Sequence, residues 1–414
     1  MIESACHERA LRRPRLLRPH LTAATMLRVS AEGAATALVL TVQARTGNAA
    51  SAGFVQTAMT LPYVLSGPVI GHALDRTGRP RRLVVALACG YAVAITLLML
   101  SAGRSPLVLV LMVAAVVGCV EPVVVALTSL LPRFVPAERL SRAYGLEASS
   151  YNIAAIAGPG LAALVAALLG GAHTGIVTVA TAALGLLVLP LMRIPPPEVR
   201  PERTRTGVKQ VVAGGLSVLG ANRVLRALTV STMFAWFGYG GFAVAAVLLG
   251  QDIGAGPAAG GQLLACFALG SLVGALASSR WLTPTRSERA VIAGLLGFGT
   301  AVAALALVPS LPWAWAACVA AGLAEGPLFA ATLMLRQRES PPDRLGQVNT
   351  TGGSLKIGAS AGGAALTGVF AGRLGADGLM LGIAAFQFAG AAMWLWLSGG
   401  PPSTVSSPSG KRRV

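Results

Sequence analysis

The strongest constraint on this chain is a succession of about twelve apolar runs, each long enough to cross a lipid bilayer. A membrane-spanning helix needs roughly 20 mostly apolar residues. The predicted spans are 22–44, 52–72, 82–102, 106–131, 146–170, 174–192, 226–249, 259–280, 289–309, 312–335, 347–371 and 376–398. Because 54% of the 414 residues are hydrophobic and only 12% are charged, we predict an all-α integral membrane protein.

The basic residues sort by loop. If the N-terminus is cytoplasmic and every span changes sides, 28 of the 33 Lys and Arg fall on the cytoplasmic side and three (Arg45, Arg104 and Arg373) on the outer side. A miscounted span would destroy this division, which follows the positive-inside rule. We therefore predict twelve spans and cytoplasmic termini. The Ala-, Gly- and Arg-rich composition indicates a bacterial inner membrane, and the net charge of +18 does not indicate nucleic acid binding.

Residues 193–225 interrupt the apolar pattern with prolines and basic residues. The predicted organisation is a basic N-terminal arm (1–21), a six-helix bundle (22–192), a cytoplasmic linker (193–225), a second six-helix bundle (226–398) and a cytoplasmic tail (399–414). Within the linker, 208–219 has the apolar spacing of a helix lying along the membrane surface.

The two predicted bundles repeat each other. Glu121 and Glu325 stand in similar contexts 204 residues apart, each preceded by a glycine at the same distance and followed by a proline. Both copies begin on the same side of the membrane, so the repeat is parallel. A repeat of this kind places a substrate site near the bilayer midplane, between the halves.

The loop after the second span reads Gly71-His-Ala-Leu-Asp75-Arg76-Thr-Gly78-Arg79-Pro-Arg81-Arg82. It resembles the G-x-x-x-D-R-x-G-R-[KR]-[RK] loop of the major facilitator superfamily, at the position where that family has it. We expect its glycines to form a tight turn and its Asp and Arg side chains to lock helix ends by charge pairing. The predicted gating residues are Gly71, Asp75, Arg76, Gly78, Arg79 and Arg82. The corresponding loop of the second half has Ser278 in place of the aspartate.

Two further patterns bear on the resemblance. Gly158-Pro159 in the fifth span is similar to a degraded form of the Gly-Pro motif of exporters in this superfamily. Small residues also pack helices closely in any membrane bundle, and that interpretation stays open. The Arg and Gln of the exporter pattern in the fourth span would fall at Ala114 and Val117, and neither is present. The family's usual proton-coupling arginine is therefore missing.

Few ionisable residues lie within the predicted spans: Arg28, Glu32, Glu121, Glu325 and Lys356, with Glu147 near the cytoplasmic end of the fifth. A charge at the bilayer centre costs roughly 2.5–3.5 kcal/mol on insertion scales, so these groups are expected to face a cavity or one another. The resemblance implies that the first, fourth, seventh and tenth spans line the central cavity. Trp236 and Tyr239 of the seventh would add an aromatic wall beside Gly240 and Gly241, where the backbone can kink.

Each candidate has a purely structural alternative. Glu32 can pair with Arg28, four residues earlier on the same helix. Glu121 and Glu325 can be structural hydrogen-bonding groups, with Lys356 involved, or one of them can exchange a proton. The aromatic group around Trp236 can face lipid or the core. The four histidines (His7, His20, His72 and His173) are predicted to lie in loops or termini, so no buried histidine relay is expected.

The sequence contains no phosphate-binding Gly-Lys-Ser/Thr loop and no metal-ligand or catalytic pattern, so neither an enzyme nor a cofactor is predicted. The resemblance implies a gradient-driven transporter. The first hypothesis is a monomeric, proton-coupled exporter of a small amphipathic compound, for which aromatic rings and carboxylates would suit a cation. An importer or facilitator of a polar nutrient and a transport-inactive receptor with the same fold remain alternatives.

Overall fold

The computed structural model describes residues 14–46, 50–133, 135–192, 207–255 and 258–398, and in these ranges the chain is helical without β-strands. Helices suit lipid because each backbone N–H and C=O finds its partner within the helix. The first elements are α2 (Pro14–Thr46), α3 (Ala50–Arg76), α4 (Pro80–Ser101), α5 (Leu107–Val120), α6 (Val123–Ala126), η1 (Leu127–Arg133), α7 (Ala137–Leu169), η2 (Gly171–His173), α8 (Gly175–Val188) and η3 (Leu189–Leu191). They are followed by α9 (Val208–Ala221), α10 (Arg223–Tyr239), α11 (Phe242–Asp252), α12 (Ala258–Trp281), α13 (Ser287–Leu305), α14 (Leu311–Glu339) and α15 (Leu345–Ser398).

The number of spans agrees with the prediction. Ten helices in the described ranges are long and apolar enough to cross a membrane. The longest of them, α15, has 54 residues and holds two predicted spans, because its backbone turns at Gly375, where φ is 61°. Glycine adopts this left-handed conformation without steric cost. A further predicted span corresponds to α3, which has 27 residues but is not among the ten. Most of the predicted N-terminal arm, the first part of the linker (193–206) and the tail lie outside the described residues.

Two of the predicted spans are interrupted at mid-length. The fourth divides into α5 and α6 at Glu121 and Pro122, because proline has no N–H with which to continue the helix. The seventh divides into α10 and α11 at Gly240 and Gly241. A side chain at Gly240 would collide with the backbone of α15 at Ser360. A side chain at Gly118 of α5 would likewise collide with the backbone of α3 at Met59, so both interrupted spans have a neighbour that approaches closely.

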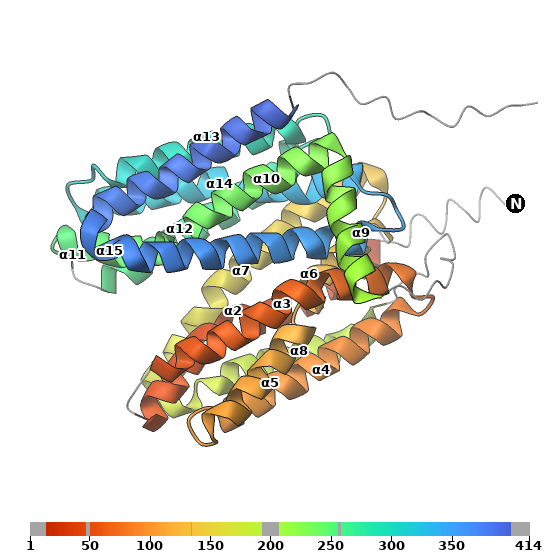
Figure 1. Ribbon diagram of the computed structural model, residues 1–414, viewed down its shortest axis with the longest axis horizontal. Helices are drawn as coiled ribbons and strands as arrows, with labels where there is room; N and C mark the ends of the chain where they lie inside the picture. Colours follow the sequence, from red (N-terminus) through yellow and green to blue (C-terminus); the bar gives the residue numbers. More distant parts are fainter. Residues whose placement is uncertain (1–13, 47–49, 134, 193–206, 256–257, 399–414) are drawn as a thin grey trace, which may run out of the picture.

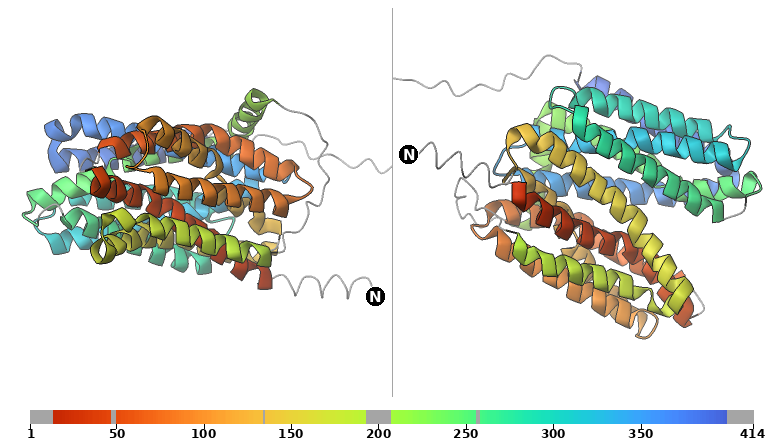
Figure 2. Two further views of the ribbon diagram at one scale, coloured as in Figure 1. Left: turned by 90° about the horizontal axis from the view of Figure 1, so that it is seen from below. Right: turned by 180° about the vertical axis from the view of Figure 1, so that it is seen from behind.

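The helices form two groups that meet at one end of the molecule (Figure 1). The first half (α2 to η3) and the second half (α10 to α15) touch mainly where α3 packs on α15 and α7 packs on α12. Figures 1 and 2 show the halves drawing together where α9 lies and spreading apart toward the opposite end. The meeting end carries the arginine-rich loops. We call it the basic end, and it includes Arg79, Arg82, Arg286, Arg338 and Arg344.

The short helix α9 lies across the basic end, nearly at right angles to the spans (Figure 1). It contacts α3, α10 and α15. The Gln347 side chain of α15 donates a hydrogen bond of 2.6 Å to the carbonyl oxygen of Val211 on α9. The segment predicted to lie along the membrane surface is thus a helix that is packed on both halves.

At the basic end, Asp75 joins α3 to the start of α15. Its carboxylate is buried and accepts the backbone N–H groups of Gly346 and Gln347, both at 2.8 Å. An anion at a helix N-terminus is stabilised by these free N–H groups and by the helix dipole. The prediction of charge pairing was wrong for Asp75, which forms no ion pair with the described residues. Gly71 is also not a turn glycine, because it lies within α3 against the backbone of Gly346, where a side chain would collide.

Candidate functional site

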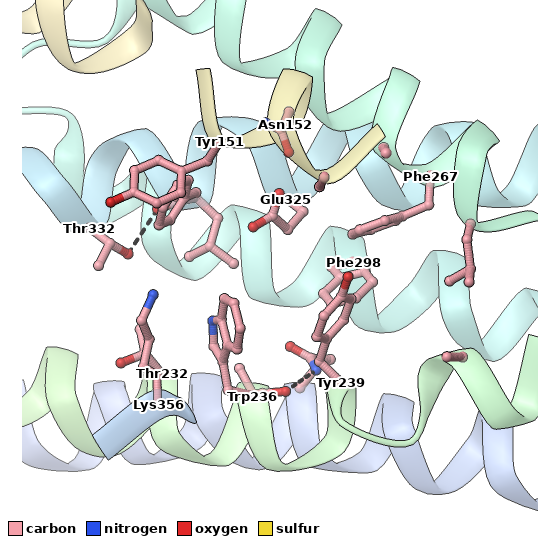
Figure 3. Close-up of a pocket in the computed structure, with 18 of the residues that line it drawn as sticks. Tyr151, Asn152, Thr232, Trp236, Tyr239, Phe267, Phe298, Glu325, Thr332 and Lys356 are labelled. Atoms are coloured by element: carbon pink, nitrogen blue, oxygen red, sulfur yellow. Dashed lines mark hydrogen bonds between the residues drawn. The ribbon is translucent and has the colours of Figure 1, made fainter. Parts of the chain in front are cut away.

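A cavity of about 380 Å³ lies between the two halves. Helices α2 and α7 of the first half and α10 to α15 of the second half line it. Its polar and ionisable members are Glu32, Tyr151, Asn152, Thr232, Trp236, Tyr239, Glu325, Thr332, Lys356 and Gln387. Figure 3 shows Lys356 and Thr332 toward one side and Phe267, Phe298 and Tyr239 toward the other, with Trp236 and Glu325 between them. The cavity therefore has a cationic side and an aromatic side.

The aromatic side is a connected group of rings. Tyr239 lies 5.4 Å from Trp236 and 5.6 Å from Phe267, measured between ring centroids, and Phe267 lies 5.5 Å from Phe298. These are the separations at which tilted aromatic rings attract one another. The rings come from α10, α12 and α13, so their contacts also fix how these helices pack. The aromatic wall therefore includes rings from the eighth and ninth spans as well as those expected from the seventh.

Glu325 projects into the cavity from the middle of α14 and accepts a hydrogen bond from the Ser271 hydroxyl of α12. This neutral donor is its hydrogen-bonding partner among the described residues. Lys356 lies within electrostatic range but not at ion-pair distance. The carboxylate is therefore held in place without being neutralised.

Lys356 is held by aromatic faces. Its ammonium nitrogen lies 4.4 Å from the centroid of Trp236 and 4.9 Å from that of Phe329. The side chain is 7% exposed and lines the cavity. A ring face attracts a cation through its quadrupole, and the attraction grows when water is excluded. Trp236 therefore contacts the Lys356 ammonium in the cavity, in addition to the lipid-facing or core packing that the sequence left open.

Glu32 lies on the cavity surface of α2 and is exposed. The alternative pair of Glu32 with Arg28 does not form, because the Arg28 guanidinium binds Glu147 instead. Among the described residues, Glu32 makes no hydrogen bond or ion pair. Its carboxylate is the second acid that a ligand in the cavity can meet.

Arg28 belongs instead to a buried ionic core of the first half, and its placement in the cavity is corrected. Its guanidinium binds Glu147 and Ser150, donates to Thr128 at 3.1 Å, and lies 3.7 Å above the Tyr151 ring. Arg28 and Glu147 are 1% and 0% exposed. Two opposite charges can both remain buried in this way because each offsets the loss of water around the other.

His20 corrects a second expectation. It lies in α2 rather than in a loop or terminus, is fully buried, and its Nε2 is 3.4 Å from the Glu147 carboxylate. The apolar run that predicts the first span begins at residue 22, whereas α2 begins at Pro14 and so already includes His20.

Glu121 is not among the residues that line the cavity. It caps the C-terminal end of α5, is partly exposed, and lies within electrostatic range of Glu32. The paired glutamates of the repeat therefore have different surroundings: among the described residues, Glu325 has a hydroxyl donor and a nearby lysine, and Glu121 has neither.

Sequence reasoning missed three residues near the cationic side. Tyr151 of α7 stacks on Arg28 and meets Phe329 of α14 edge-on, at 5.2 Å between centroids, across the two halves. Arg336 follows directly after the predicted span 312–335, but it lies inside α14 and is 2% exposed. The unbroken run from Leu328 to Leu335 was the available signal, since neither glycine nor proline ends the helix before Arg336.

Gly158 fixes the position of α7 on α2. A side chain at Gly158 would collide with the backbone of Gly33 and Val29, so the two helices touch through their main chains. Small residues allow this approach in membrane bundles. The contact brings Tyr151 and Asn152, two turns earlier on α7, to the cavity. Pro159 lies in the same turn of the helix.

Comparisons with known proteins agree with this architecture. A family model described as Major Facilitator Superfamily matches residues 21–356. An uncharacterized MFS-type transporter, y4rN, of Sinorhizobium fredii is 27% identical over 84% of this chain and 87% of its own length. The multidrug efflux pump Tap of Mycolicibacterium fortuitum is 26% identical over 81% of this chain and 84% of its own. Among solved structures, the human organic anion transporter MFSD10 (TETRAN) superposes with a TM-score of 0.78 at 16% identity, covering 92% of this chain and 99% of that one.

Proposed function

The chain belongs to the major facilitator superfamily, and from this premise we propose that it exports a small amphipathic compound across the bacterial inner membrane in exchange for protons. The cavity is the observation that carries the proposal. It joins an aromatic surface, formed by Tyr239, Phe267 and Phe298, to the ionisable groups Glu325 and Lys356. A pocket with an apolar wall and a few placed polar groups suits a small amphipathic ligand.

Alternating access supplies the mechanism. We place the basic end in the cytoplasm because basic loops are retained there. In that orientation the halves meet at the cytoplasmic end, and the described conformation faces outward. Transport then requires the two predicted bundles (22–192 and 226–398) to rock as units, so that the hydrogen bonds of Asp75 break and re-form in each cycle. A single chain contains the whole cavity, which supports a monomer as the working unit.

Export is favoured over nutrient import by two observations. Relatives that align over most of this chain are named multidrug efflux pumps. Most of the surface that lines the cavity is also apolar, formed by aromatic rings and aliphatic side chains, and such a surface suits an amphipathic compound better than a polar nutrient.

Glu325 is the group we assign to proton exchange. Glu325 faces the cavity, and its hydrogen-bonding partner Ser271 is neutral. Protonation of Glu325 therefore breaks no ion pair. Glu147 is a poorer candidate because its protonation would leave Arg28 without its counter-charge inside the first half. The first half has alanine at position 114 instead of the exporter arginine, which is a further reason to assign proton exchange to the second half.

The test is transport in proteoliposomes under an imposed pH gradient, with a panel of cationic, neutral and anionic amphipathic dyes. The wild type is expected to move at least one dye, and Glu325→Gln to reduce pH-driven movement by about tenfold or more. Glu288→Gln, a carboxyl at the basic end that pairs with Arg338, is the matched control. Undiminished movement in Glu325→Gln would remove this residue from coupling, and a wild type that moves no dye would contradict export.

A further inference from the structure

The cationic side of the cavity holds a lysine, Lys356, that forms no ion pair with the described residues. The Lys356 ammonium is in contact with two ring faces, and the described residues place no carboxylate oxygen within 4.0 Å of it. Ring faces offset only part of what an ammonium group loses on leaving water. Because the side chain also lines the cavity, an anion that enters can reach it.

A second cation lies behind the first. Arg336 is one turn of α14 beyond Thr332, toward the basic end, and its guanidinium packs over Gly352 of α15. Its Nε and Nη2 atoms are buried without a hydrogen-bond partner, and it forms no ion pair with the described residues. Arg336 acts electrostatically on Lys356. The two cations repel each other, and both add to the positive potential that an anion meets at this side of the cavity.

Among the described residues, no nearby acid forms an ion pair with Lys356 or Arg336. Glu325 lies within electrostatic range of Lys356 but not at ion-pair distance, Glu32 on the opposite half forms no ion pair, and Glu147 is paired with Arg28. Buried charge without an ion-pair partner is unfavourable even after the surrounding protein relaxes. An anionic group of the ligand would supply the missing charge, while the rings beside it would cover an aromatic or alicyclic body.

We propose that Lys356, with Arg336 behind it, forms a subsite for the carboxylate or sulfonate group of an amphipathic organic anion. The body of the ligand lies on the rings of Trp236 and Tyr239, which Figure 3 shows between Lys356 and Phe267. As the description of a transported substrate, this inference rests on the proposed function. It replaces the amphipathic cation expected from the sequence with an anion.

Binding of matched probes tests the subsite. The full-length protein, purified in detergent, is equilibrated by dialysis with 2-naphthoate, the neutral 2-naphthamide or the cationic 2-naphthylmethylammonium. The wild type is expected to bind the carboxylate about tenfold or more tightly than either of the others. Lys356→Met should remove that preference and leave naphthamide binding within about twofold, and Arg336→Met should reduce it by about threefold. Lys209→Met, on the exposed face of α9, is the matched control and should keep it.

Three results would overturn the proposal: tighter binding of the ammonium probe by the wild type, no retention of naphthoate at millimolar concentration, or a carboxylate preference that survives Lys356→Met. If that variant fails to fold, the order of the three probes on the wild type still decides. Proteoliposome transport separates this proposal from the first. Carboxylate-selective binding without transport would contradict the proposed export and support the subsite. Transport without a carboxylate preference would support export and contradict the subsite.

Discussion

The two halves of the molecule share a repeat but treat their charges differently. In the first half, Arg28 and Glu147 neutralise each other in a core that water does not reach. In the second half, Lys356 lies on aromatic rings and Glu325 on a serine hydroxyl, and both face the cavity. Charges with neutral partners remain available to a ligand. We therefore propose that the second half carries most of the binding chemistry, together with Glu32 of the first half, whose remaining buried charges form an ionically fixed frame.

The same asymmetry holds at the basic end. Asp75 of the first half binds the N-terminus of α15, which belongs to the second half. Its counterpart in the repeat, Ser278, is buried and donates to Ala275 of its own helix. The closed basic end is therefore fastened by a carboxylate on one side only, and substitutions on the two sides should have unequal effects.

The largest effect is expected from Glu147→Gln. It leaves Arg28 buried without a counter-charge, and breaking such a pair costs about 3–5 kcal/mol. We expect a steep loss of folded protein on heating in detergent, followed by size-exclusion chromatography. The double variant Arg28→Met/Glu147→Leu should recover most of the stability. If Glu147→Gln loses no more than Glu288→Gln, whose ion pair is partly exposed, the ionic frame is wrong.

Gly71→Ala should have the next largest effect. The added methyl group collides with the backbone of Gly346, and overpacking of this kind costs about 1–3 kcal/mol. The collision exists only when the basic end is closed, so the population should shift toward opening there. Spin labels at Arg82→Cys and Pro342→Cys, in a background without other cysteines, would report the distance between the two halves at the basic end by pulsed electron paramagnetic resonance. Gly78→Ala is the control, since nothing lies within 4 Å of its added atom, and an equal shift in both variants would refute the contact.

Asp75→Asn should act in the same direction but more weakly. The amide keeps the shape and one acceptor but loses the charge, and hydrogen bonds to charged groups contribute about 1.5–3 kcal/mol, of which only part is lost. The same pair of spin labels should show a smaller open population than Gly71→Ala. Ser278→Ala, its counterpart, should leave the distances unchanged. An effect of Ser278→Ala as large as that of Asp75→Asn would show that both sides fasten the basic end.

The sequence was sufficient for the framework. Apolar length and loop charge predict twelve spans because lipid imposes both constraints on any such chain. Glu32, Glu325 and Trp236 could be predicted as cavity residues because ionisable and aromatic groups in a span need a reason to be there. The residues that these side chains contact could not be predicted from the sequence. Whether Arg28 pairs with Glu32 or with Glu147 depends on how α7 packs on α2, and that is fixed by the contact between Gly158 and Gly33.

Accessibility of the cavity from the two sides tests the central claim most directly. Ala155 of α7 is exposed and lines the cavity, and Ala155→Cys in a background without other cysteines places one thiol there. In oriented vesicles, a membrane-impermeant maleimide should label it from the side opposite the basic loops, and addition of Gly71→Ala should increase labelling from the basic side. Labelling of Ala155→Cys from the basic side alone, or labelling that Gly71→Ala does not change, would contradict an alternating cavity between the two halves.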